Sequence, residues 1–162
     1  MPISPYVRAM RDKIGHDLLC LQSVAVLLFD DQCRLLLAQG KGSPLWMTVG
    51  GAVEPDETPA NAAVRECLEE TGLRAGITDI IGVFGGPDFR VTYPNGDAVS
   101  YVITAFKARL LEGDLRPDGG ETAALRFFTE KEAMVLPMSA LTKELVRHGY
   151  AYDGTPYFTP PD

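Results

Sequence analysis

The stretch from residue 58 to residue 73, TPANAAVRECLEETGL, has the most tightly constrained local structure in the sequence. Thr58 is a residue type that caps helix N-termini, Pro59 fits the first helical turn, and Gly72 is typical just past a helix end. One modest apolar stripe repeats between them at helical spacing, made of Ala60, Ala63, Val64, Cys67 and Thr71. A helix with one apolar stripe has to bury it against another layer, so we expect the stripe to face a β-sheet.

Apolar and β-branched runs on both sides of this helix predict the strands of that sheet. They cover residues 21–30, 34–39, 45–49, 75–85, 100–110 and 124–128, and residues 87–99 predict a strand pair turning at Asn95-Gly96. Residues 4–15 and 139–149 carry helix start and stop signals. Because strands outnumber helices and several are neighbours, we predict an α/β (α+β) fold in which helices pack on a mixed β-sheet.

The bulk composition fits one domain and excludes several classes of protein. The 162 residues are 46% hydrophobic, too many for a disordered chain. The sequence has no apolar run long enough for a membrane span, and its first residues lack the apolar core expected of a signal peptide. The cysteines, Cys20, Cys33 and Cys67, are far apart and odd in number, so we expect packing roles and a reduced, cytoplasmic location. The net charge of -7 argues against binding a nucleic acid polymer.

Three glutamates of the predicted helix point into one narrow arc. Taking about 100° per residue, Glu69 and Glu70 lie within about 60° of Glu66. Like charges four residues apart destabilise a helix by roughly 0.2–0.5 kcal/mol, yet carboxylates are also the ligands that magnesium and manganese prefer. Arg65 lies four residues before Glu69, close enough to pair with it. On spacing alone, a solvated acidic helix face explains this arc as well as a metal site does.

The wider pattern favours the metal site, because it resembles a known family signature. Gly51, five residues, Glu57, seven residues and then RECLEETGL resemble the Nudix box, with every glycine, arginine and glutamate at its spacing. Two positions depart from the family pattern, Cys67 at an aliphatic position and Val49 where proline is frequent. The resemblance implies a Nudix-type α/β/α sandwich over residues 18–150, with helices on both faces of a mixed sheet. Residues 1–17 would form a helical extension, and residues 151–162 a tail rich in proline and aromatic residues.

The resemblance also implies an activity. Nudix enzymes use divalent metal, here expected to be Mg²⁺ or else Mn²⁺. They hydrolyse a phosphoanhydride in a nucleoside diphosphate linked to another moiety, such as a nucleotide sugar, ADP-ribose or a nucleoside triphosphate. Carried over, Glu66 and Glu70 would be the principal metal ligands, and Glu69 a further ligand or the group that orients the attacking water. The resemblance further implies that Arg65 holds Glu69 in place and that Glu57 supports the metal site from the loop. A backbone carbonyl of Gly50 or Gly51 would bind the metal.

A late loop acid often acts as base or extra ligand in this family, and Glu121 is the candidate, with Asp118 as its rival. Trp46 and Arg90 are candidate substrate contacts, through base stacking and phosphate binding, although a core tryptophan and a surface arginine are the commoner roles. The expected substrate is a small phosphorylated nucleotide, with no membrane partner. The sequence is compatible with a homodimer. The alternative function is that of a non-catalytic nucleotide-sensing or interaction domain. Cys67 is expected to pack rather than react.

Overall fold

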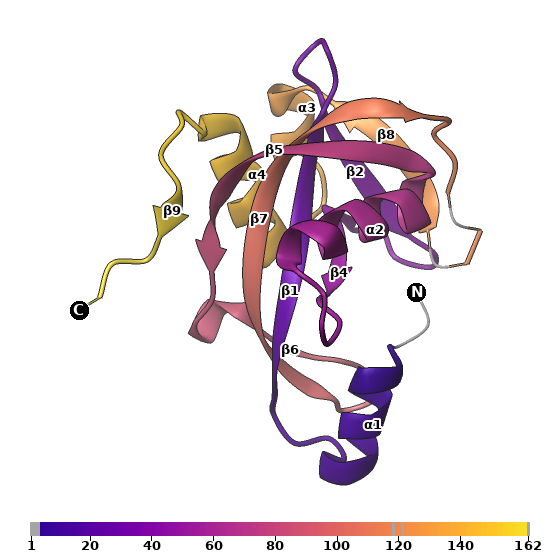
Figure 1. The fold of residues 1–162 in the computed structure, drawn as a ribbon, viewed down its shortest axis with the longest axis vertical. Coiled ribbons are helices and arrows are strands. Elements are labelled where there is room, and N and C mark those ends of the chain that lie inside the picture. The colour runs from indigo at the N-terminus through magenta and orange to yellow at the C-terminus, as the bar shows by residue number, and fades with distance from the viewer. Residues whose placement is uncertain (1–3, 118, 121, 162) are drawn as a thin grey trace.

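The computed structural model describes residues 4–117, 119–120 and 122–161, and Figure 1 traces its elements along the chain. The helices are α1 (Pro5–Ile14), α2 (Pro59–Thr71), α3 (Glu130–Met134) and α4 (Ala140–Ala151), with a 3-10 turn η1 (Pro87–Phe89). The strands are β1 (Leu19–Phe29), β2 (Leu35–Gly40), β3 (Trp46–Met47), β4 (Val49–Ala52), β5 (Leu73–Phe84), β6 (Arg90–Thr92), β7 (Ala98–Gly113), β8 (Thr122–Phe128) and β9 (Tyr157–Phe158).

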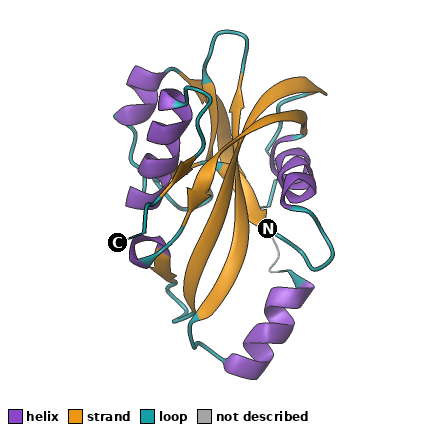
Figure 2. Cartoon of the chain, turned by 60° about the vertical axis from the view of Figure 1, so that its left-hand side comes forward, coloured by secondary structure: helices purple, strands orange, loops and turns teal. Residues whose placement is uncertain are grey.

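These strands form one mixed sheet. Its main path is β3-β2-β1-β7-β5-β9, while β4 pairs with β1, β6 with β7 and β8 with β2. The long central pair, β1 and β7, is parallel, whereas β5 and β7 are antiparallel. Figure 2 shows helices on two sides of the strands, with α1 set apart at one end. The predicted fold, a mixed sheet with helices packed on both faces, is confirmed.

Two apolar clusters join the layers, one on each face of the sheet. Strand β1 contributes to both because its side chains alternate: Val24 and Val26 lie in the cluster under α2, whereas Ala25 and Leu27 lie in the cluster under α4. Helix α2 adds Ala62, Ala63 and Cys67 to the first cluster. The second cluster takes Ala133, Leu145 and Val146 from α3 and α4. Burial on both faces explains why β1 is a nearly continuous apolar run.

Helix α2 begins and ends where the sequence predicts. The Thr58 side chain accepts a hydrogen bond from the Asn61 backbone N–H at 3.2 Å, and Gly72 is left-handed with φ of 73°. The predicted stripe is only partly right, because Ala60 and Val64 are half-buried while Ala62 and Glu66 are fully covered.

Other local predictions need correction. Cys20 and Cys33 are exposed rather than packed. The predicted strand 45–49 and the loop after it are instead two short strands, β3 and β4, and β4 contains both glycines of the Gly50-Gly51 pair. Helix α3 was not predicted, although a capping box between Thr129 and Glu132 marks its start.

The N-terminal helix and the C-terminal tail both contact the sheet of their own chain. Near α1, the Arg11 guanidinium donates to the Ala98 carbonyl at 2.8 Å, and His16 Nδ1 lies 2.7 Å from Asp97 Oδ1. The tail returns along β5, where β9 forms a short parallel pair. The tail therefore adds a short strand to the edge of the sheet of its own chain (Figure 1). Among the described residues, no helix is both long enough and apolar enough to cross a membrane.

Candidate active site

Arg65 on α2 is the centre of a cluster of carboxylates. It donates to both oxygens of Glu57, with nitrogen–oxygen distances of 3.0 and 2.9 Å, and to Glu66 Oε1 at 2.8 Å. It also donates to the Ala52 carbonyl at 3.1 Å and to Glu69 Oε2 at 3.3 Å. The Arg65–Glu69 contact expected from spacing is therefore present, but it is the longest of these bonds, and Glu57 is the bidentate partner. Hydrogen bonds from Arg65 lower the pKa of the Glu57 carboxyl, while those carboxylates raise the pKa of Arg65.

Glu66 is the buried member of the cluster. Only 1% of the residue is exposed, and its Oε2 atom has no hydrogen-bond partner among the described residues, whereas Oε1 is paired with Arg65. Burial raises the pKa of the Glu66 carboxyl even though Arg65 opposes that shift. A buried carboxylate oxygen with no donor costs free energy, which a cation beside it would recover.

The glycines of β4 shape the other wall of the site. A Cβ atom on Gly51 would overlap Glu66 Oε1 and stand 2.7 Å from Oε2, so any side chain there would push the carboxylate out of its present position. Gly50 has φ of 150°, and a Cβ there would overlap the Val24 carbonyl oxygen. The Gly50 N–H also points to Glu70, with a distance of 3.4 Å to Oε2. Gly50 thus lets β4 lie close to β1, while Gly51 leaves room for the Glu66 carboxylate of α2 beside the β4 backbone.

Ser23 is a contact of the glycine pair that the sequence did not predict. Its hydroxyl donates to the Gly51 carbonyl at 2.8 Å from strand β1, and the residue is buried. The available signal was a serine in an otherwise apolar strand, which does not by itself say what the hydroxyl contacts.

The predicted metal ligands lie close together but are organised around Arg65. In residues 4–117, 119–120 and 122–161, no three His, Cys, Asp or Glu side chains gather in a way that could hold a metal ion. The physical reason is that Arg65 already draws Glu57, Glu66 and Glu69 toward itself. The bare oxygen of Glu66, with Glu70 beside the β4 backbone, nevertheless fits a hard divalent cation that takes oxygen ligands. The ligand set stays a prediction.

The remaining predicted residues lie apart from this cluster or outside the description. Trp46 packs edge-on against Phe128, with ring centroids 4.7 Å apart, next to the core under α4. Arg90 is exposed at the start of β6. Both candidate loop acids, Glu121 and Asp118, lie outside the described residues, so their roles stay predictions.

Cys67 is fully buried on the side of α2 that faces the sheet, and its sulfur lies 3.7 Å from the Thr71 hydroxyl. Burial raises the pKa of this thiol, which disfavours a reactive thiolate. These contacts support the packing role expected for it.

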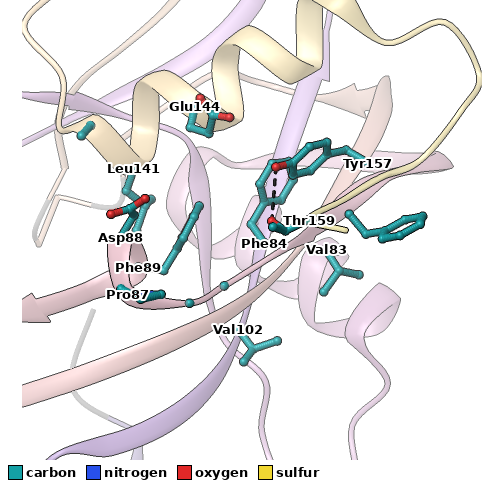
Figure 3. Close-up of a pocket in the computed structure, with 14 residues that line it drawn as sticks. Val83, Phe84, Pro87, Asp88, Phe89, Val102, Leu141, Glu144, Tyr157 and Thr159 are labelled. Atoms are coloured by element: carbon teal, nitrogen blue, oxygen red, sulfur yellow. Dashed lines mark hydrogen bonds between the residues drawn. The ribbon is translucent and has the colours of Figure 1, made fainter. Parts of the chain in front are cut away.

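The structure also has a cavity of about 820 Å³ (Figure 3), and neither Arg65 nor its carboxylate partners line it. Phe84 and Phe89 of the β5–η1 segment, Leu141 of α4 and Tyr157 of the tail form much of its wall. None of the predicted site residues that the structure describes lines it. Among the described residues, the charged side chains that line this cavity are Asp88 and Glu144, so this part of its lining offers no cation for a phosphate chain. We therefore place the candidate chemistry at Arg65 and the glycine pair rather than in this cavity.

The fold and this cluster together define the class of the protein. Residues 21–149 match the family model described as NUDIX domain, so the chain belongs to the NUDIX domain family.

Comparison with individual proteins gives a consistent assignment. The chain is 35% identical over 106 residues to the Bacillus subtilis (strain 168) protein named putative 8-oxo-dGTP diphosphatase; the match covers 65% of this chain and 64% of that protein. The match therefore spans slightly less than two thirds of that relative. A crystal structure of the MutT protein from Methanosarcina mazei Go1 superposes with a TM-score of 0.68 at 18% identity, covering 86% of this chain and 99% of the other. A structure titled UDP-X diphosphatase gives 0.66 at 23% identity, covering 90% and 70%. These two structures support the fold alone.

Proposed function

We propose that this protein is a metal-dependent hydrolase that cleaves a phosphoanhydride bond in a nucleoside diphosphate linked to another group. The observation that carries the proposal is the buried Glu66 carboxylate, whose Oε2 atom has no donor among the described residues and lies against the Gly51 backbone. A solvated acidic helix face would not bury one of its carboxylates in this way. Membership of the NUDIX domain family supports the same conclusion.

In this proposal, Glu66 and Glu70 would hold the divalent cation, with Glu69 and the Gly50 carbonyl as further candidates. Mg²⁺ is the expected ion, and Mn²⁺ is the alternative. When bound, such an ion supplies positive charge to phosphate oxygens and acidifies a water molecule. Arg65 keeps the neighbouring carboxylates in place through its bonds to Glu57 and Glu66.

The proposed substrate is a small nucleotide derivative rather than a polymer. The net charge of -7 does not suit the phosphate backbone of a duplex. The name of the Bacillus subtilis relative makes an oxidised purine nucleoside triphosphate the first compound to test. Nucleotide sugars and ADP-ribose complete the proposed substrate classes. We also propose a homodimer and a cytoplasmic location, which measurements of oligomeric state and of localisation would test.

A hydrolysis screen over these compounds tests the function. We expect phosphate or nucleoside monophosphate release that requires Mg²⁺ or Mn²⁺ and stops with a chelator. Glu70→Gln should abolish it, whereas Asp56→Asn, which removes an exposed acid from the loop before α2, should leave it intact. Tight nucleotide binding without any product would instead favour the alternative, a nucleotide-sensing domain. Equal activity in Glu70→Gln and wild type would overturn the metal assignment.

A further inference from the structure

We propose that Ser23 is a positioning residue for the Glu66 and Glu70 carboxylates, acting through the Gly50-Gly51 backbone. Its catalytic consequence rests on the proposed function. Ser23 is buried at 8% exposure in β1, and its hydroxyl donates to the Gly51 carbonyl at 2.8 Å. A hydroxyl in this apolar strand gains nothing from burial unless it is bonded, so the bond to β4 accounts for its presence.

Ser23 and Glu66 contact β4 from opposite faces of the sheet. Side chains along β1 alternate, with Val24 in the cluster under α2 and Ala25 in the cluster under α4. Ser23 has the same parity as Ala25, so its side chain lies on the α4 face. The Gly51 backbone is therefore held by a hydroxyl on one face and pressed against the Glu66 carboxylate on the other.

The glycine pair transmits this constraint to both proposed metal ligands. The space beside Gly51 that a Cβ would occupy is filled by the Glu66 carboxylate, so we expect a shift of the Gly51 backbone to change the position of that carboxylate. Gly50, its neighbour, directs its N–H to Glu70 Oε2. One hydroxyl thus limits the movement of two carboxylates that it does not touch. Outer partners of this kind orient the ligands of metal sites, and their loss costs roughly 10–100-fold in affinity or activity.

The test compares Ser23→Ala with two matched variants. Ser23→Thr keeps a hydroxyl, while Thr142→Val removes another buried hydroxyl from α4, on the opposite face from α2, where it bonds Ser139 at 2.9 Å. Mn²⁺ binding is measured by electron paramagnetic resonance, and thermal unfolding is followed in parallel. Ser23→Ala should weaken Mn²⁺ binding by roughly 10–100-fold, and Ser23→Thr should restore it. Thr142→Val should change only the melting temperature.

Carboxyl ¹³C signals of Glu66 and Glu70 in the metal-free protein decide the positioning role independently of metal. Both signals should move in Ser23→Ala and neither in Thr142→Val. Unchanged signals in a folded Ser23→Ala protein would overturn the inference, even if the wild type binds Mn²⁺ and hydrolyses nucleotides. Shifted signals in a protein whose wild type binds no Mn²⁺ would support the positioning role and refute the proposed function instead.

Discussion

Replacing Glu66 by Gln should change how stability depends on pH, because this carboxyl is buried with one oxygen bare. Burial raises its pKa in the folded protein above the ordinary value of 4.5. Glu66 therefore contributes stability that is fully present below the unfolded pKa and is lost as the pH rises through the folded pKa. As the pH falls from neutral, the wild type should gain stability relative to Glu66→Gln. The gain is limited to one proton, a slope of at most about 1.36 kcal/mol per pH unit.

The assay is urea unfolding of both proteins with a chelator present, from neutral pH to below the ordinary carboxyl pKa of 4.5. The difference in unfolding free energy between the two proteins isolates Glu66, since unrelated groups titrate equally in both. Glu57→Gln is the matched control on the same guanidinium. Because Arg65 lowers the pKa of Glu57, its contribution is present above the unfolded pKa and is lost as the pH falls through the folded pKa. The two difference curves should thus run in opposite directions.

A flat difference curve for Glu66→Gln would refute the reasoning, because it would mean that burial does not penalise the ionised carboxyl. The same variant should lose hydrolysis by more than the roughly 100-fold that marks the upper end for outer-shell residues. The free energy of unfolding of Glu66→Gln at a single pH is less informative than its pH dependence, because the substitution has two opposing effects. The new amide keeps an acceptor for Arg65 but places an N–H₂ group where Glu66 Oε2 has no partner in the described structure.

Three further predictions test other parts of the molecule. Cys67→Val should keep metal-dependent hydrolysis within a few-fold and alter stability by about 1 kcal/mol; a folded, metal-binding but inactive variant would show that the thiol is chemical. Glu121→Gln should cut the maximal rate by roughly 10²–10⁴-fold if it is the general base, whereas a crippled Asp118→Asn beside a normal Glu121→Gln would assign the role to Asp118. Tyr157→Ala should lower the free energy of unfolding by about 1–3 kcal/mol, because the Tyr157 ring contacts those of Phe84 and His148. It should also expose the tail to limited proteolysis while nucleotide hydrolysis stays unchanged. An unchanged melting temperature and an unchanged cleavage pattern would contradict this account of the tail.

Helix α2 shows what the sequence can predict. Its limits follow from local chemistry, since Thr58 caps the first turn and Gly72 adopts the left-handed conformation after the last. The shared face of Glu66 and Glu69 follows from helical geometry alone. Strand positions were also largely predictable, because burial on both faces makes most of β1 apolar.

The burial of Glu66 was not predictable from the same rules. Helical spacing placed it beside the apolar stripe, and an acidic residue is expected to be solvated there. Its burial depends on Gly51, distant in sequence, whose missing side chain lets the carboxylate approach the β4 backbone. The Ser23 contact depends on the pairing of β1 with β4, where Val24 faces Gly51. Such long-range contacts are set by strand register, which local propensity does not specify.

These contacts show how several acids are held close together around one guanidinium. Arg65 pairs with three carboxylates, so its single positive charge is shared among Glu57, Glu66 and Glu69 and offsets only part of their negative charge. The remaining cost is concentrated on Glu66, whose Oε2 atom is buried without a donor there. Sites of function are often where a fold tolerates such a local cost. A cation bound beside that oxygen would relieve the cost only in the folded state, so the atom that weakens the metal-free protein is the one that favours metal binding.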